Sequence, residues 1–471
     1  MSIPGLIFVL AMHLLAGRGL LAMFGVKERL ITTFALSMIT GVVIDALIPV
    51  LLEMCRIPIT TTNVGLALTI TAAALFVPHA RKLDYNRLRN ARIRMPRLYE
   101  LIFLVVFAAL MAPTVWRCFY YPPNARDVIS GPEPIADYTI KEHTMLNSAF
   151  TVDLSTTNNH LKPPFVSGLQ IIYKLFVTAF GQLWISVIAL CFLAWLYVLM
   201  RERLHPILAG LLMLLFITMP DPYAYTYIIL FDYSNMVLFF AGIYYLCKHI
   251  ETRDNKLFLY ATVLFALATS IRAETLILLV MVAPLPFYHF VKRKAGLKQT
   301  VWYMGLFMFI PFVLYYLWMG LFMKYYMPVP YSVGQDVNLS AERMPFFFER
   351  FWYMNKNLLY SKLGLDLFGY MYYVFPVVLL ADAIFIRKWN TEARVMLYGL
   401  LILYIGIPIL GTILPLFDLN NTTKRSLYKM LPLMMLYMAN SGVLQKLSAA
   451  ISKFEQGGKL VVAEIPDIEK Q

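Results

Sequence analysis

The stretch from Gly181 to Met200 reads GQLWISVIALCFLAWLYVLM and contains no charged residue in twenty positions. A helix of this length spans about 30 Å, the thickness of the hydrocarbon core of a bilayer. Lipid offers no partner for free backbone N–H and C=O groups, so an apolar run of this kind must be helical. The stretch therefore predicts a transmembrane helix.

Similar apolar runs recur along the whole chain. Of its 471 residues, 60% are hydrophobic and only 14% are charged, and the mean hydropathy is +0.66. A soluble domain would carry about 25% charged residues. We predict an all-α, polytopic membrane protein with about thirteen transmembrane helices, near residues 4–24, 30–53, 62–79, 99–116, 181–200, 206–220, 231–248, 257–271, 274–290, 300–323, 365–386, 395–417 and 429–445.

The basic residues predict an orientation, because Lys and Arg gather in cytoplasmic loops. The richest short loop holds seven of them between Arg81 and Arg97. Placing this loop in the cytoplasm puts the N-terminus outside and the C-terminus inside, and we expect a bacterial plasma (inner) membrane. The net charge of +14 does not indicate nucleic acid, since the basic residues are scattered over the loops between spans.

Three basic segments on the predicted outer side break this rule, at 117–174, 324–362 and 424–429. The first two are also the only long loops, and long loops in compact proteins usually carry function. We predict an N-terminal three-span extension with its basic cytoplasmic loop (1–98). A transmembrane core (99–446) with outside loops 117–180 and 324–364 follows, and then a short cytoplasmic tail (447–471).

The first outside loop is acidic and ends in His-Leu-Lys162-Pro-Pro-Phe165. The two prolines restrict the backbone and hold Lys162 extended at the mouth of the next helix, where it can meet a phosphate. Three further motifs follow it on the predicted outer side. They are YIILFDY around Asp232, ALATSIRAE around Arg272, and KRSLYKMLP, which contains Arg425 and Tyr428.

These four motifs, in this order, resemble the GT-C glycosyltransferases. The likeness is to members that use polyprenyl-phosphate sugars, such as the aminoarabinose transferase of lipid A and the protein O-mannosyltransferases, and it covers about residues 99–446. It implies transfer of a sugar, with inversion, from a polyprenyl-phosphate donor to a hydroxyl of a glycan, lipid or protein acceptor on the outer side of the membrane. The chain departs from the family pattern, because three spans precede the first loop and the usual Asp-Glu pair is missing.

The resemblance also implies roles for particular residues. A carboxylate should act as catalytic base, with Asp137 the preferred match and Asp127 the alternative. Some relatives bind a divalent cation, and Asp137 with Asp232 would hold one if this chain does; no other cofactor is expected. The residues expected to bind the lipid phosphate are Lys162, Arg272, Arg425, Arg343, Arg350 and Tyr428.

Structural interpretations of the same residues stay open. Asp232 can cap the helix that follows it, Arg272 can belong to a simple turn, and Arg425 can extend to the membrane surface. Asp45, in the second predicted span, is expected to pair with Arg18 rather than to relay protons, because a lone charge there is costly.

Two other functions compete with glycosyl transfer. A transporter, flippase or polymerase of lipid-linked saccharides is the main alternative, and repeated halves or broken helices would favour it. The sequence shows no internal repeat. A non-catalytic membrane scaffold would leave the four motifs unexplained.

Overall fold

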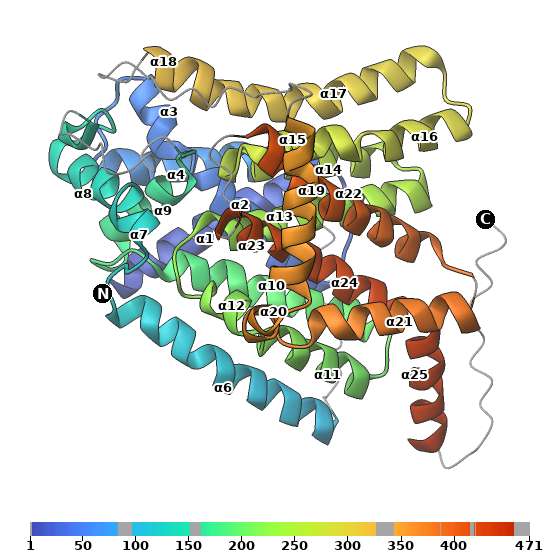
Figure 1. Ribbon diagram of the computed structural model, residues 1–471. Coiled ribbons are helices and arrows are strands. Elements are labelled where there is room, and N and C mark those ends of the chain that lie inside the picture. Colours follow the sequence, from blue (N-terminus) through green and yellow to red (C-terminus); the bar gives the residue numbers. More distant parts are fainter. Residues whose placement is uncertain are drawn as a thin grey trace.

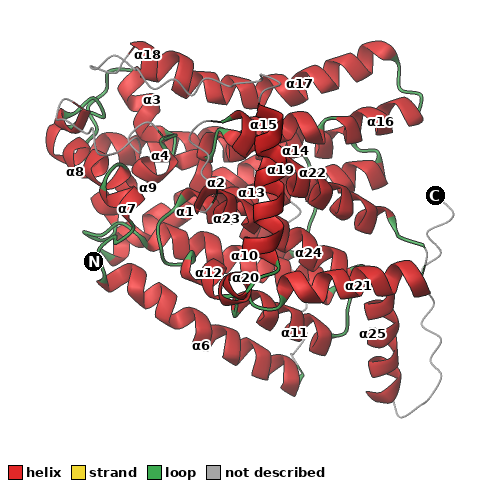
Figure 2. Ribbon diagram, in the orientation of Figure 1, coloured by secondary structure: helices red, strands yellow, loops and turns green. Residues whose placement is uncertain are grey.

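The computed structural model describes residues 2–82, 97–150, 162–325, 343–386, 388–414, 419 and 421–455. These ranges contain helices and turns but no strand, which confirms the predicted all-α class (Figure 2). Within them, eight helices are long and apolar enough to cross a membrane. A ninth is added if the bent pair Lys362–Phe368 and Met371–Phe385, which meet at 93°, forms one span. The protein is thus a polytopic helical membrane protein by length and composition, while the count of thirteen spans stays a prediction.

The eight candidate spans include single helices and helices that run on into one another. They are α1 (Ile3–Met23), α2 (Leu30–Asp45) with α3 (Ile48–Met54), α4 (Thr61–Phe76) with the first residues of η1 (Val77–Lys82), α6 (Leu98–Tyr120), α10 (Leu183–Arg201), α15 (Glu274–Val282) with α16 (Pro284–Lys292), α17 (Leu297–Tyr316) with η4 (Leu317–Phe322) and α18 (Met323–Tyr325), and α22 (Thr391–Ile413).

The other helices are shorter or less apolar, and several of them coincide with predicted spans. They are α7 (Arg126–Ile129), α8 (Pro132–Glu142), α9 (Phe165–Phe176), α11 (Pro206–Ile217), α12 (Pro220–Ala224), α13 (Phe231–Thr252), α14 (Asn255–Ile271), α19 (Met344–Tyr353), η6 (Met354–Leu359), α20 (Lys362–Phe368), α21 (Met371–Phe385), α23 (Asn421–Ser426), η7 (Leu427–Lys429), α24 (Met430–Ala439) and α25 (Gly442–Glu455).

Helices α1 and α2 pack at backbone contact through two glycines. A Cβ atom added at Gly17 would lie 1.8 Å from the carbonyl oxygen of Ser37, and one added at Gly41 would lie 1.8 Å from that of His13. Small residues allow this approach between membrane helices. The resulting register brings His13 Nδ1 to 2.7 Å from Asp45 Oδ2, so the α1 partner of Asp45 is His13 and not Arg18 as predicted.

The N-terminal helices contact helix α9 and the segment around Thr144. Helix α9 packs against α2, where a Cβ atom added at Gly168 would lie 2.0 Å from the carbonyl oxygen of Ala46. Glu53 accepts hydrogen bonds from Thr144 Oγ1 at 2.8 Å and from the Met145 amide at 2.6 Å. Helix α9 is buried within the protein from its first residue through Tyr173.

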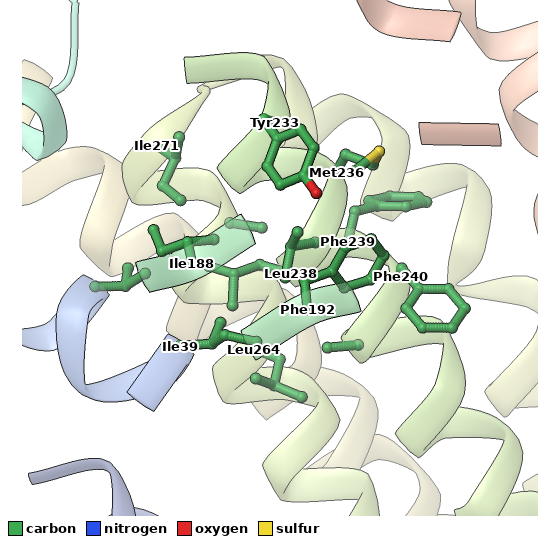
Figure 3. Packing of buried hydrophobic residues seen from close by; sticks show 14 of the residues in the cluster. Ile39, Ile188, Phe192, Tyr233, Met236, Leu238, Phe239, Phe240, Leu264 and Ile271 are labelled. Carbon is green, nitrogen blue, oxygen red and sulfur yellow. The ribbon is translucent and has the colours of Figure 1, made fainter. Parts of the chain in front are cut away.

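Helix α13 runs through the middle of the molecule between α10, α14 and α22 (Figure 1). Its residues from Phe231 to Cys247 are all buried. Figure 3 shows Phe239 and Phe240 of this helix among side chains from α2, α10 and α14. This core sets the position of Asp232, in the first turn of α13.

Candidate functional site

Three of the predicted phosphate-binding cations converge on two carboxylates. Lys162 precedes α9, Arg272 joins α14 to α15, and Arg425 lies on α23. Asp127 comes from α7 and Asp232 from α13. We refer to these five residues as the charged cluster. Its members come from five segments that are far apart in the sequence, so tertiary structure alone brings them together.

Asp127 anchors the more open side of the charged cluster. Its Oδ2 atom lies 2.6 Å from Arg425 Nη1 and 3.6 Å from Lys162 Nζ, and its side chain is 26% exposed. Burial opposes ionisation of this carboxyl, but the charges of Lys162 and Arg425 outweigh burial and hold its pKa below the usual value. Asp127 is therefore an ionised carboxylate within reach of solvent.

Asp232 forms the buried side of the charged cluster. Its side chain is fully buried, and Arg272 Nη1 lies 3.3 Å from its Oδ1 atom. Neither carboxylate oxygen accepts a hydrogen bond from any residue that the structure describes. The N-cap residue of α13 is Leu230, so Asp232 does not cap this helix as the structural interpretation had it.

Arg272 links Asp232 to a second pair of charges. Its Nη2 atom donates to Glu274 Oε2 at 3.0 Å, and Glu274 Oε1 lies 2.9 Å from Lys429 Nζ. Lys429 is 1% exposed. Arg272 therefore does more than close a turn, because it links α13 to Glu274 of α15, which in turn contacts Lys429 of η7. Sequence reasoning missed Lys429, although it directly follows Tyr428 in a motif already singled out.

Tyr428 lies beside the charged cluster and donates its hydroxyl hydrogen to Asp221. Lys424 Nζ lies 3.5 Å from the same carboxylate, and the ring of Tyr225 meets that of Tyr428 edge-on at 4.8 Å. Lys424 and Arg425 thus both engage carboxylates, rather than only extending toward the membrane surface. Asp221 was not among the residues singled out from the sequence.

Lys162 is the least engaged cation of the charged cluster. Its Nζ atom lies 5.3 Å from the centre of the Phe231 ring and 3.6 Å from Asp127 Oδ2, farther than Arg425 lies from the same carboxylate. Burial and the neighbouring charge of Arg272 lower its pKa to about 8, because they outweigh the attraction of Asp127 and Asp232. A cation with free donor capacity is suited to an incoming anion.

Asp137, the preferred catalytic residue from the sequence, lies in another network. It is half-exposed on α8, and its Oδ1 atom accepts a hydrogen bond from Lys174 Nζ at 2.6 Å. Lys174 also reaches Glu133 Oε1 at 2.5 Å, and Gln170 donates to the other oxygen of Glu133 at 2.6 Å. These contacts fasten α8 to α9.

The two arginines expected from the second long loop belong to α19 and its N-cap, and they contact the end of α22. Arg343 Nη1 donates to the carbonyl oxygen of Thr412 at 3.2 Å. Arg350 packs on Gly411, where an added Cβ atom would lie 2.5 Å from Nη1 of the arginine. Both side chains thus pack α19 against α22, the helix that leads toward α23 and Arg425.

The expected metal ligands do not form a common site. Within the described ranges, no group of three or more His, Cys, Asp or Glu side chains is placed to hold a metal ion. Asp232 lies against Arg272, while Asp137 lies against Lys174. A dication at either carboxylate would face a resident positive charge, so we derive no step through a metal.

Comparison of the chain with family models, with curated proteins and with solved structures gave no significant match.

Proposed function

We propose that this chain is an integral membrane glycosyltransferase of the GT-C type. It would move a sugar from a polyprenyl-phosphate donor to a hydroxyl of a glycan, lipid or protein acceptor, on the outer side of a bacterial plasma membrane. The convergence of Lys162, Arg272 and Arg425 on Asp127 and Asp232 carries this proposal. The sequence motifs single out the three cations for phosphate binding and Asp127 as a possible base.

The charge balance of the charged cluster favours an anionic ligand. Three cations face two carboxylates, which leaves one positive charge among groups that are largely shielded from water. Fixed positive charge in a water-poor site stabilises the charge that develops on a departing phosphate. A lipid phosphate that replaces Asp127 as the partner of Lys162 would use the donors that Lys162 leaves free.

The proposed reaction is a direct displacement. The acceptor oxygen attacks the anomeric carbon from the face opposite the phosphate and forms the new glycosidic bond. The bond between the anomeric carbon and the phosphate oxygen breaks, and its electron pair leaves with the polyprenyl phosphate beside Lys162, Arg272 and Arg425. The acceptor proton passes to a carboxylate, a transfer worth about 10²–10⁴-fold in rate.

Asp127 is the carboxylate that suits the base role best. It is ionised and partly exposed, so an acceptor hydroxyl can approach it from solvent. Asp232 is fully buried, and Asp137 is engaged by Lys174 in a different network. We therefore prefer Asp127, the alternative from the sequence, and give Asp137 a structural role.

The bent pair α20 and α21 is the one observation that favours a transporter or flippase, because broken helices are typical of such proteins. Identification of the lipid that co-purifies with the chain, followed by transfer assays with that lipid class, separates the two functions. The proposal is supported if Lys162→Met abolishes glycosyl transfer. The control variant Arg394→Gln, at an exposed arginine of α22, should preserve it. Movement of intact lipid-linked sugar across a bilayer, without bond cleavage, would replace this proposal with the transporter.

A further inference from the structure

The C-terminal helix α25 does not continue the last span. The predicted span 429–445 breaks, because α24 ends at Ala439 and α25 begins at Gly442. Figure 1 shows α25 running across the end of the bundle and away from α21. The buried carboxylate of Asp382 fixes the turn, since it accepts hydrogen bonds from Ser441 Oγ at 2.9 Å and the Val443 amide at 3.0 Å.

Both ends of α25 are tied to the ends of candidate spans. Asp382 lies in the last turn of α21, the longer arm of the bent pair. At the other end of α25, Glu455 accepts a hydrogen bond from Arg97, the N-cap residue of α6, and lies 3.2 Å from His205 Nε2. A 14-residue helix is about 21 Å long and here bridges two span ends. Its two ends therefore lie at the ends of α21 and α6.

An exposed face of α25, beside the face docked on the protein, carries an apolar stripe. Leu447 is 46% exposed and Phe454 is 87% exposed, with the exposed Ala450 between them. Spacings of three and four residues place the three on one helix face. Lys446 and Lys453 are also exposed and, at 100° per residue, lie along one edge of this stripe.

We propose that α25 is an interfacial helix that lies in the plane of the membrane and binds anionic lipid. Leu447, Ala450 and Phe454 enter the boundary between headgroups and acyl chains, roughly 5–10 Å deep. Lys446 and Lys453 contact lipid phosphates beside them. The arrangement of residues around α25 supports this proposal. One face of the helix is docked on the protein, a second is apolar and exposed, and a row of lysines borders the apolar face.

The test uses the full chain in liposomes that contain about one third anionic lipid. Cys55 is the exposed cysteine, and Cys118, Cys191 and Cys247 are buried, so Cys55→Ser provides a background for labelling. Nitroxides are attached at Leu447→Cys, Phe454→Cys and, as control, Ala449→Cys on the basic side. We expect labels at 447 and 454 to collide more with oxygen than with a water-soluble nickel chelate, and the label at 449 to show the reverse.

Two further arms decide what contacts the stripe. The double substitution Lys446→Gln and Lys453→Gln should reduce the depth of the labels at 447 and 454 in the bilayer. In liposomes of neutral lipid, the labels should lie at the same depth with and without this double substitution. Equal accessibility of all three labels to the nickel chelate would overturn the proposal. The proposal would also be overturned if the labels at 447 and 454 are shielded from both reagents and the shielding ends on truncation after Glu455 or on dilution of the protein. Loss on truncation would mean that the C-terminal tail covers the stripe, and loss on dilution that a second copy of the chain does.

Discussion

The guanidinium of Arg272 lies 3.3 Å from a carboxylate oxygen of Asp232, and neither oxygen of that carboxylate accepts a hydrogen bond from the described part of the chain. Ion pairs removed from water usually have their remaining lone pairs satisfied by hydrogen bonds. This pair instead keeps acceptor capacity facing Lys162 and Arg425. The charge of the buried Asp232 is therefore balanced by Arg272 and by the nearby charges of Lys162 and Arg425 rather than by hydrogen bonds.

Replacement of the two candidate bases should separate their roles. Asp127→Asn should lower kcat for sugar transfer by about 10²–10⁴-fold, because the acceptor proton loses its carboxylate. Asp137→Asn should keep kcat within a few fold and lower the unfolding temperature, because it weakens the contact of α8 with Lys174. Steady-state kinetics and thermal unfolding of both variants check this. A large loss of kcat in Asp137→Asn with little change in Asp127→Asn would instead identify Asp137 as the base.

Binding of the lipid phosphate should weaken above pH 8. The pKa of Lys162 is about 8 in the free protein, so the ammonium is present below that pH and is lost as the pH rises through it. A bound phosphate favours the ammonium, so the association constant should fall by up to tenfold per pH unit above about 8. Titration of polyprenyl phosphate between pH 6.5 and 9.5 measures this. Lys162→Arg should flatten the profile, because arginine stays charged.

Glu274 should be essential for stability. It neutralises Arg272 and Lys429, and Glu274→Gln leaves both cations without their shared carboxylate. Removal of one partner from a buried pair typically costs about 3–5 kcal/mol, so a large drop in unfolding temperature is expected. Adding Lys429→Met to Glu274→Gln should recover part of the loss. A single variant as stable as the wild type would exclude this role.

A methyl group at Gly168 should disturb the site from a distance. A Cβ atom there would meet the carbonyl oxygen of Ala46 at 2.0 Å, so α9 must move away from α2 and shift Lys162 at its start. Gly168→Ala should therefore lower both the unfolding temperature and the affinity for polyprenyl phosphate. Gly305→Ala in α17 is the matched control, because nothing lies within 4 Å of its added Cβ. Similar behaviour of the two variants would contradict the prediction.

The sequence predicts the all-α class, and three of the five cations that it singles out lie together in the structure, for identifiable reasons. Long apolar runs determine helices in lipid, and charges placed at the ends of such runs, as at Lys162, Arg272 and Arg425, cluster on one side of the bundle. The number of spans is less accessible, because α11 and α24 are apolar but too short to cross a bilayer by length alone.

The choice between Asp127 and Asp137 was not accessible from the sequence. Both residues lie in one acidic loop. They differ in their tertiary contacts, because Asp127 meets Arg425 of α23 whereas Asp137 meets Lys174 of α9. Lys429 and Asp221 were missed for a related reason, because their partners Glu274 and Tyr428 lie 155 and 207 residues away along the chain.

The contact between Asp127 and Arg425 joins residues that are 298 positions apart in the chain. At 5–20 residues per second, a ribosome makes the second of these residues roughly 15–60 s after the first. During this interval Asp127 lacks the arginine that pairs with it. A chain released early, or one whose last helices fail to insert, would therefore lack the contact that joins α7 to α23.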